Sequence, residues 1–247
     1  MATSLRIHQK EQLDDLTLSG ESLRKTLWSM KLINRFFGCH KQMIDGVIEI
    51  ILDDNYLLDN ILGQLRGEEN TIRVVDLGSG GGDCIMQLNQ RFAKQDIVVN
   101  FTGIDGNPHS TKLAQDESDY LNTRFVTADI LSPDFELPKN DVIMSNHFIY
   151  HFEDDALTDF LKNLKHTSTK KIIFNELRRN KLSIFLFKWL RHVLPITSIA
   201  KKDGLTGIKR SFTIDEMHNI IKKSGITDYE IVKKPWFRML VKINLNA

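Results

Sequence analysis

The spacing of apolar residues along the chain changes near residue 70. Before that point apolar residues recur every three to four positions, as they do on one face of a helix. The first such stripe consists of Leu23, Leu27, Met30 and Asn34. A second predicted helix covers residues 43–51, and a third covers residues 56–65 and ends before Gly67. The pattern therefore predicts an N-terminal helical cap over residues 1–70.

After residue 70 the apolar residues form short continuous runs that alternate with helical stretches. The runs that predict strands are 72–77, 97–104, 124–127, 142–145 and 172–175. Continuous runs of Val and Ile suit strands that are covered on both faces, as in a parallel sheet. The alternation of strands and helices predicts one α/β domain over residues 71–247.

The C-terminal part predicts how this sheet ends. Thr213 and Glu216 form a capping box at the start of a helix that Gly225 is expected to end. Two further apolar runs, 229–232 and 237–243, are joined only by Lys-Lys-Pro-Trp. Because this connection is too short for a crossover helix, the two runs are expected to pair antiparallel. The sheet should therefore be mostly parallel with an antiparallel last strand.

The most informative segment leaves the first predicted strand and enters a helix expected over residues 84–92. It reads Asp76-Leu77-Gly78-Ser79-Gly80-Gly81-Gly82-Asp83. Glycines without a Cβ atom let a ligand lie against the backbone. A dinucleotide fingerprint needs a third glycine where this chain has Asp83, whose carboxylate would repel a diphosphate. S-adenosylmethionine carries an ammonium and a sulfonium, so we expect this cofactor; a nicotinamide cofactor, or a tight turn without any ligand, is the alternative.

Acidic residues also follow the next two predicted strands. Asp105, followed by Gly106, can accept both ribose hydroxyls of an adenosine, although a turn or helix-cap aspartate has the same local pattern. Asp129, followed by Ile130, ends the third strand. Ligands of open α/β sheets bind at the carboxyl ends of the strands. Three acidic strand ends together are therefore a more specific signal than any one alone.

With these residues the chain resembles small-molecule class I methyltransferases, nearest those of ubiquinone and menaquinone biosynthesis. A narrower likeness is to methyltransferases that accompany type III polyketide synthases and act on phenolic lipids or quinols. The stretches that carry it are 32–38, 175–179, Asp203-Gly204 and 209–212. The chain departs from that group at Arg178 and Lys202, which replace histidines, so a base role for those histidines does not transfer.

This resemblance implies a Rossmann-like class I methyltransferase sheet that binds S-adenosyl-L-methionine and releases S-adenosyl-L-homocysteine. It implies that Asp129 reaches the adenine amino group and that the Ile130 N–H reaches a ring nitrogen. It also implies that Asn146 contacts the amino-acid end of the cofactor. An apolar segment over residues 182–190 follows the fifth strand, where relatives cover the acceptor pocket. A hydrophobic acceptor is expected there, although an ordinary core helix or a dimer interface has the same composition.

The acceptor chemistry suggests which residues to examine. A phenol has a pKa of about 10, and a base that takes its proton contributes typically 10²–10⁴-fold. His151 is the first candidate base; the alternative is that it starts a helix and packs on Phe152. Glu176 is the second candidate; the alternative is that it forms an ion pair with a neighbouring arginine.

Other residues are expected to bind ligands without acting as a base. Arg35 is expected to pair with the carboxylate of the cofactor; the alternative is an ordinary surface arginine. Residues expected to bind the acceptor are Asn34, His147, Arg178 and Arg210. The fourth strand lacks the Asn/Asp-Pro-Pro pattern of nitrogen methylation, so oxygen or carbon acceptors are favoured.

Composition narrows the function further. The 247 residues have a net charge of +1, which gives no support for nucleic-acid binding. Two distant cysteines form no metal framework and suit a reducing, cytoplasmic location. The apolar 182–194 stretch is too short and too charged for stable membrane insertion. We therefore expect an O-methyltransferase for a phenolic or quinol-type molecule, without a metal and with a possible homodimer. C-methylation is the alternative, and a nicotinamide-dependent oxidoreductase is a remote one.

Overall fold

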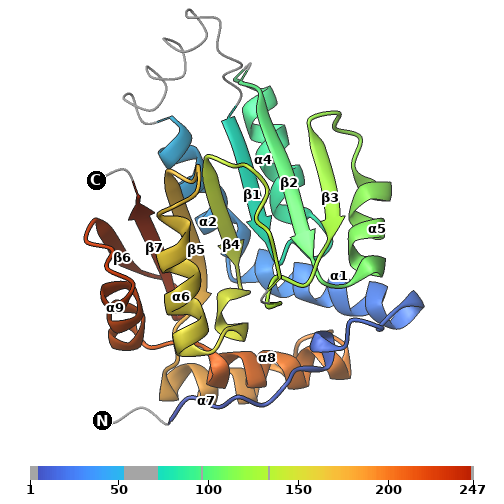
Figure 1. Cartoon of the computed structure of the whole chain (residues 1–247). Coiled ribbons are helices and arrows are strands. Elements are labelled where there is room, and N and C mark those ends of the chain that lie inside the picture. The colour runs from blue at the N-terminus through green and yellow to red at the C-terminus, as the bar shows by residue number, and fades with distance from the viewer. Residues whose placement is uncertain (1–4, 53–71, 96, 133, 246–247) are drawn as a thin grey trace, which may run out of the picture.

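A computed structural model of the chain describes residues 5–52, 72–95, 97–132 and 134–245. The helix expected over residues 56–65 lies outside these residues. The described part is built around a seven-stranded sheet with strand order β3-β2-β1-β4-β5-β7-β6 (Figure 1). Its strands are β1 (Ile72–Leu77), β2 (Val99–Asp105), β3 (Thr123–Thr127), β4 (Val142–Asn146), β5 (Lys171–Leu177), β6 (Tyr229–Lys234) and β7 (Arg238–Asn244).

The direction of pairing confirms the predicted sheet. Strands β1 to β5 pair in parallel, whereas β7 lies antiparallel between β5 and β6. The hairpin between β6 and β7 is tighter than expected, because Trp236 and Phe237 adopt left-handed φ angles of 59° and 57°. Phe237 is therefore a turn residue and not the first residue of the last strand.

Helices cover both faces of the sheet. They are α1 (Gly20–Phe36), α2 (Cys39–Ile51), α4 (Asp83–Ala93), α5 (Pro108–Glu117), α6 (Asp154–Leu164), α7 (Lys181–Leu190), α8 (Ser198–Arg210) and α9 (Ile214–Lys223), with short 3-10 helices η1 (Gln12–Asp14) and η2 (Ile149–His151). One buried cluster joins α6 and α9 to the sheet, and a second joins α2 and α4 to its other face. Thr213 and Glu216 form the predicted capping box, and Gly225 has a left-handed φ just after α9.

The remaining helices gather at one edge of the sheet. In Figure 1 the arrowheads of β1 to β4 point to the edge where α1, α7, α8 and the segment before α1 lie. Helix α2, in contrast, packs against β5 and α4 within the core. The predicted boundary between a cap over residues 1–70 and the sheet domain stays a prediction. Among the described residues, no helix has the length and apolar character that a membrane crossing requires.

Candidate active site

The glycine segment forms a tight loop between β1 and α4. Gly78, Gly80 and Gly82 have φ angles of 73°, 52° and 76°, a region that other residues rarely adopt. The backbone N–H groups of Gly78 and Ser79 donate to the Ile104 carbonyl of β2. The loop is thereby fastened to the neighbouring strand, with its backbone exposed to the edge above it.

Two of these glycines also fill places where no side chain fits. A Cβ atom at Gly78 would lie 2.4 Å from Cγ of Phe148, in the loop after β4. A Cβ atom at Gly82 would lie 2.5 Å from Cζ of Phe125 on β3. Gly82 precedes α4 and lets this helix start close to the sheet. Its role is therefore close packing, whereas the other loop residues face an open hollow.

This hollow has a volume of about 1870 Å³ including its open mouth, and it runs along the carboxyl ends of the strands. The predicted cofactor residues that line it are Asp76, Gly78, Ser79, Gly80, Asp83, Asp105, Gly106, Asp129, Ile130 and Asn146. The predicted stripe of α1, formed by Leu23, Leu27, Met30 and Asn34, covers it from the other side. The hollow therefore brings together residues from the ends of β1, β2 and β4, from the segment after β3 and from an N-terminal helix.

The carboxylates at its floor are buried. Asp105 accepts the backbone N–H groups of Gly80 and Asn107, both at 2.9 Å, and burial raises its pKa. Burial and the charge of Asp105 raise the pKa of Asp76 well above its ordinary value. Asp76 Oδ1 and the Ser79 hydroxyl are buried oxygen atoms that have no hydrogen-bond partner in the described part of the chain. A bound ligand that donates hydrogen bonds would satisfy both.

The other predicted residues have mixed surroundings. Asp129 Oδ1 accepts the Leu131 N–H at 3.0 Å, so part of its role is to fix a turn. Asn146 Oδ1 accepts the side-chain amide of Asn175 at 2.8 Å. Asp83 forms an ion pair with Lys31 of α1, which offsets its charge at the start of α4.

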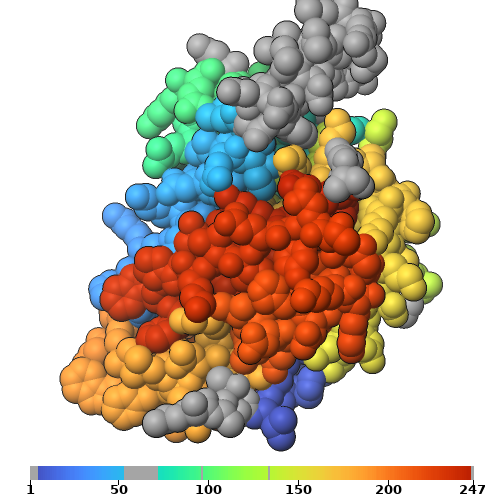
Figure 2. Space-filling view, turned by 90° about the vertical axis from the view of Figure 1, so that its left-hand side faces the viewer, coloured from blue at the N-terminus to red at the C-terminus, as the bar shows by residue number. Residues whose placement is uncertain are grey.

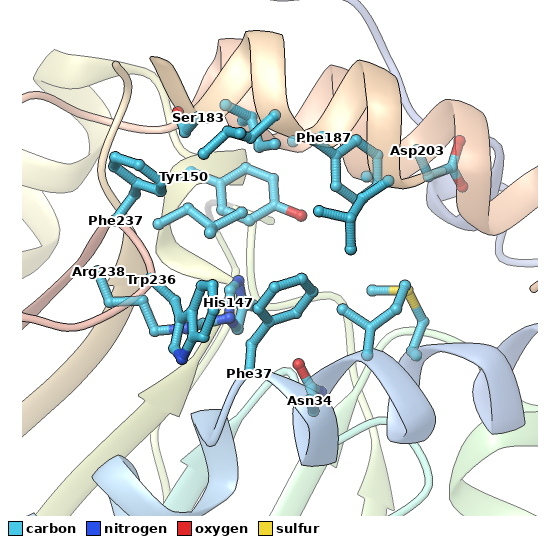
Figure 3. Close-up of a pocket in the computed structure, with 18 of the residues that line it drawn as sticks. Asn34, Phe37, His147, Tyr150, Ser183, Phe187, Asp203, Trp236, Phe237 and Arg238 are labelled. Atoms are coloured by element: carbon cyan, nitrogen blue, oxygen red, sulfur yellow. The ribbon is translucent and has the colours of Figure 1, made fainter. Parts of the chain in front are cut away.

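A second, apolar cavity lies beside the hollow and occupies about 840 Å³ when its open mouth is included (Figure 3). Its walls come from α1, α7, α8 and the hairpin of β6 and β7, and include Ile33, Phe37, Leu186, Leu190 and Phe237. Two polar residues that Figure 3 labels, Asn34 and Tyr150, direct oxygen atoms into it.

The two spaces meet at one wall. The residues that line both are Glu11, Met30, Asn34, His147 and Tyr150. We refer to these five residues as the shared wall. It carries several polar groups between a polar hollow and an apolar cavity, so a group transferred from one space to the other would pass here.

A carboxyl group of the N-terminal segment lies in the shared wall. Glu11 is buried; its Oε2 accepts the Tyr150 hydroxyl at 3.2 Å, and its Oε1 has no hydrogen-bond partner. Burial, and then the charge of Asp14, raise the pKa of Glu11 to about 8 although Arg210 opposes them. Glu11 is therefore mostly neutral at pH 7.

A histidine–aspartate pair lies next to this group. His151 Nδ1 is 3.1 Å from Asp14 Oδ1, and the imidazole stacks on Tyr150 at a centroid distance of 4.4 Å. Arg210 donates to the other Asp14 oxygen at 2.7 Å. Burial alone would raise the pKa of Asp14, but the bonds from His151, the Glu11 backbone and Arg210 lower it well below its ordinary value. Asp14 thus stays ionised and holds His151 in place.

The second predicted base occupies a different place. Glu176 is fully buried, lines neither space, and burial raises its pKa to about 8. Its Oε1 accepts the backbone N–H groups of Phe148 at 2.9 Å and Ile149 at 3.0 Å. Arg179 pairs with Glu216, and Oε2 of Glu176 has no hydrogen-bond partner among the described residues. Glu176 therefore fixes the turn between β4 and η2, and a proton-accepting role does not fit its position.

The same turn positions His147. This residue has a left-handed φ of 62°, and its ring contacts the buried guanidinium of Arg238. Burial and the charge of Arg238 lower the pKa of His147 well below its ordinary value. His147 is thus a neutral member of the shared wall, in line with the predicted pocket role.

Two predicted arginines lie elsewhere. Arg35 is exposed on α1, and Arg178 contributes its backbone N–H to the Phe237 carbonyl at 2.7 Å; neither lines the hollow or the cavity. Sequence reasoning missed Glu11, Asp14 and Lys31. Glu11 and Asp14 precede the first apolar stripe, in a segment without periodicity, so no local signal marked them.

Comparison with known proteins assigns the fold that surrounds this site. Residues 74–170, which include the glycine loop and Asn146, match the family model described as a methyltransferase domain. This part of the chain is therefore a methyltransferase domain. No protein of curated function matches its sequence.

Solved structures share the fold of this chain at low identity. The pyocyanin biosynthetic protein PhzM is 16% identical with a TM-score of 0.58, and the match covers 95% of this chain and 62% of that one. Magnesium protoporphyrin IX methyltransferase from Synechocystis PCC 6803, solved with bound S-adenosylhomocysteine, is 14% identical with a TM-score of 0.53, over 92% and 88%. The C-methyltransferase domain of the citrinin polyketide synthase is 12% identical with a TM-score of 0.52, over 72% of this chain and 47% of that one. The chain thus spans about half of the length of that last protein.

The hollow fits S-adenosylmethionine chemically. The unpartnered oxygen atoms of Asp76 and Ser79 can accept hydrogen bonds from an ammonium or hydroxyl group. Each Asp105 oxygen that already accepts one N–H has a lone pair left for a ribose hydroxyl. Two predicted cofactor residues lie outside the hollow: Gly82, which packs against β3, and Arg35, which is exposed.

Proposed function

We propose that this chain is an S-adenosylmethionine-dependent methyltransferase that methylates a hydroxyl oxygen of an apolar small molecule of the phenolic or quinol type. The observation that carries the proposal is the shared wall, which joins a cofactor-sized polar hollow to an apolar cavity. An acceptor with an apolar body and one reactive hydroxyl would fill the cavity and present the hydroxyl to the wall. The acceptor class is supported by this lining and by the resemblance of the sequence.

The protein's first contribution is alignment. The cofactor supplies a methyl group that is already activated by the positive sulfur. Asp105, the glycine loop and α1 hold the cofactor from two sides, and the cavity holds the acceptor from a third. Holding two reactants in line contributes on the order of 7–11 kcal/mol in favourable cases. Leu186, Phe187 and Phe237 exclude water from the acceptor side.

The second contribution is removal of the acceptor's proton. Asp14 accepts the Nδ1–H of His151, which leaves Nε2 of a neutral imidazole free to take a proton. The hydroxyl oxygen would then be ready to accept the methyl group that a bound cofactor would supply, with a neutral thioether as the leaving group. Asp14 also stabilises the imidazolium that results, because its own pKa is low.

Methyl transfer from isotope-labelled cofactor to a panel of phenolic lipids and quinols tests this function. We expect a product whose labelled methyl group lies on oxygen, as read by tandem mass spectrometry and by the methyl carbon shift in NMR. A labelled methyl group on a ring carbon would show that the reaction is C-methylation and not O-methylation. Binding of S-adenosylhomocysteine without transfer to any acceptor of the panel would contradict the acceptor class.

The base is tested separately with His151→Ala. This variant should lose 10²–10⁴-fold in kcat. His166→Ala, which removes an exposed histidine after α6, is the matched control and should keep full turnover. Full turnover in His151→Ala would remove the base assignment and leave the transferase function unaffected.

A further inference from the structure

Helix α7 carries apolar side chains on an inner face and on a neighbouring outer face. Its inner face lines the apolar cavity with Ser183, Leu186, Phe187 and Leu190. Its outer face, continued by the turn that follows, exposes Leu182, Phe185, Trp189 and Val193. Phe185 is 66% exposed and Trp189 is 72% exposed. These four residues are spaced for one side of a helix, so they form a continuous stripe, which we call the outer stripe.

The chain around the outer stripe is strongly basic. Between Glu176 and Asp203 there is no acidic residue, and the lysines and arginines of this interval are Arg178, Arg179, Lys181, Lys188, Arg191, Lys201 and Lys202. Arg179 is buried in its pair with Glu216, but Lys181 and Lys188 are exposed beside the stripe. The whole protein has a net charge of only +1, so positive charge is concentrated on this part of the surface.

The acceptor cavity reaches the surface next to this region. Trp236, in the hairpin of β6 and β7, lines the cavity and is also 52% exposed. Figure 3 places Trp236 and Phe37 across the cavity from Ser183 and Phe187 of α7. Figure 2 shows the orange atoms around α7 at the lower edge of the molecule, beside the red atoms of the hairpin. Exposed tryptophans therefore lie on both sides of the cavity.

We propose that the outer stripe and its lysines dock on the surface of an anionic lipid bilayer. Aromatic side chains bury favourably at the headgroup level, and flanking Lys and Arg residues are attracted to anionic lipids. A second copy of the chain is disfavoured, because a two-fold interface would place the same basic region against itself. Docking in this orientation faces the cavity's aromatic rim to the membrane, so an apolar acceptor enters from the bilayer; this last step rests on the proposed function.

Co-sedimentation of the full chain with vesicles tests the docking without any acceptor. The vesicles contain either phosphatidylcholine alone or equal parts of phosphatidylcholine and phosphatidylglycerol. We expect at least about tenfold stronger partition onto the anionic vesicles, and weaker partition at high salt. Phe185→Ser/Trp189→Ser and Lys181→Glu/Lys188→Glu should each lower this partition by about tenfold or more.

Matched controls lie at the opposite edge of the sheet. Val98→Ser/Leu121→Ser removes two exposed apolar residues that precede β2 and β3, and Lys94→Glu/Lys139→Glu reverses two exposed lysines there. Both controls should partition like the wild type, and all variants should bind S-adenosylhomocysteine normally. Equal partition onto both vesicle types, or equal losses in variants and controls, would overturn the docking. So would a wild-type dimer that only the outer-stripe variant dissociates.

Comparing vesicle binding with methyl transfer separates this inference from the proposed function. Vesicle binding without methyl transfer to any phenol or quinol would leave the docking surface in place and remove the acceptor class. Methyl transfer to a water-soluble phenol without vesicle binding would remove the docking surface and leave the acceptor class in place.

Discussion

Replacing Glu11 by glutamine is expected to remove a pH dependence that distinguishes S-adenosylmethionine from S-adenosylhomocysteine. Glu11 lies in the shared wall, and its pKa of about 8 makes it mostly neutral at pH 7. In our proposal the sulfonium of the substrate lies against this wall, whereas the product carries a neutral sulfur there. A positive charge nearby favours the ionised carboxylate, so only the substrate should lower the pKa of Glu11.

The size of the effect follows from linkage. Burial has moved the pKa from an ordinary 4.5 to about 8, which corresponds to roughly 5 kcal/mol against the ionised form. If attraction to the sulfonium offsets about a third of this free energy, the pKa of Glu11 in the complex falls by about one unit. Affinity for S-adenosylmethionine would then rise by about tenfold as the pH approaches 8, and would level off above it.

Calorimetric titration of both cofactors between pH 6 and 9 measures this ratio. The α-amino groups of the two cofactors titrate differently, because only one of them carries a sulfonium; this contribution is a property of the ligands, so it is the same in the wild type and in Glu11→Gln. We therefore expect the ratio to rise with pH more steeply in the wild type than in Glu11→Gln. Parallel profiles for the two ligands in the wild type, or an unchanged slope in Glu11→Gln, would refute the placement of the sulfonium beside Glu11.

Stability provides a second readout of the same group. The folded state holds the Glu11 proton up to about pH 8, whereas the unfolded chain releases it near 4.5. The free energy of unfolding should therefore decrease as the pH rises through this window. Because glutamine does not titrate, Glu11→Gln should lose less stability over that range in urea unfolding. Equal losses would show that Glu11 is ionised in the folded protein.

Three further changes test the surroundings of this wall. Gly78→Ala should lower the free energy of unfolding in urea by about 1–3 kcal/mol more than Gly20→Ala does. Both glycines have a positive φ, but only at Gly78 would the added Cβ atom meet an aromatic ring, so equal losses would contradict this packing. Asp14→Asn should lower kcat by at least about tenfold with S-adenosylhomocysteine affinity nearly unchanged, because His151 loses its orienting carboxylate; an unchanged kcat would exclude this role. Asp105→Asn should weaken S-adenosylhomocysteine binding in calorimetry by about tenfold or more, through the lost charge-assisted hydrogen bonds, whereas the exposed Asp116→Asn should not.

The parts of the fold that follow from local sequence were predictable. Continuous apolar runs marked the strands, because a strand that is buried on both faces needs apolar residues at every position. The short connection before β7 predicted its antiparallel direction, and glycines at positive φ marked the cofactor loop. The end of β6 was misplaced, because the left-handed pair Trp236 and Phe237 moves the turn toward the C-terminus.

The shared wall was only partly predictable, because it depends on contacts between distant segments. His147 and Tyr150 follow β4, whereas Glu11 lies far away in sequence and reaches them only when the N-terminal segment crosses the strand ends. Glu176 was misassigned for a related reason. Its place just after a buried strand suggested an active-site acid, but its carboxylate turns back to hold the backbone of residues 148 and 149.

The charge balance of the reaction explains why titratable groups collect at this wall. Transfer of a methyl group to a hydroxyl converts a cationic sulfonium into a neutral thioether and releases one proton. If the proton moves to His151, the positive charge lost from sulfur reappears a short distance away, and the buried surroundings never hold an uncompensated charge. Asp14, ionised by its bonds to His151 and Arg210, compensates the cation before and after transfer. Glu11, neutral in the absence of ligand, adds a negative charge only while the sulfonium is present. The wall would thus stabilise the charged substrate without holding the neutral product, which favours release of S-adenosylhomocysteine.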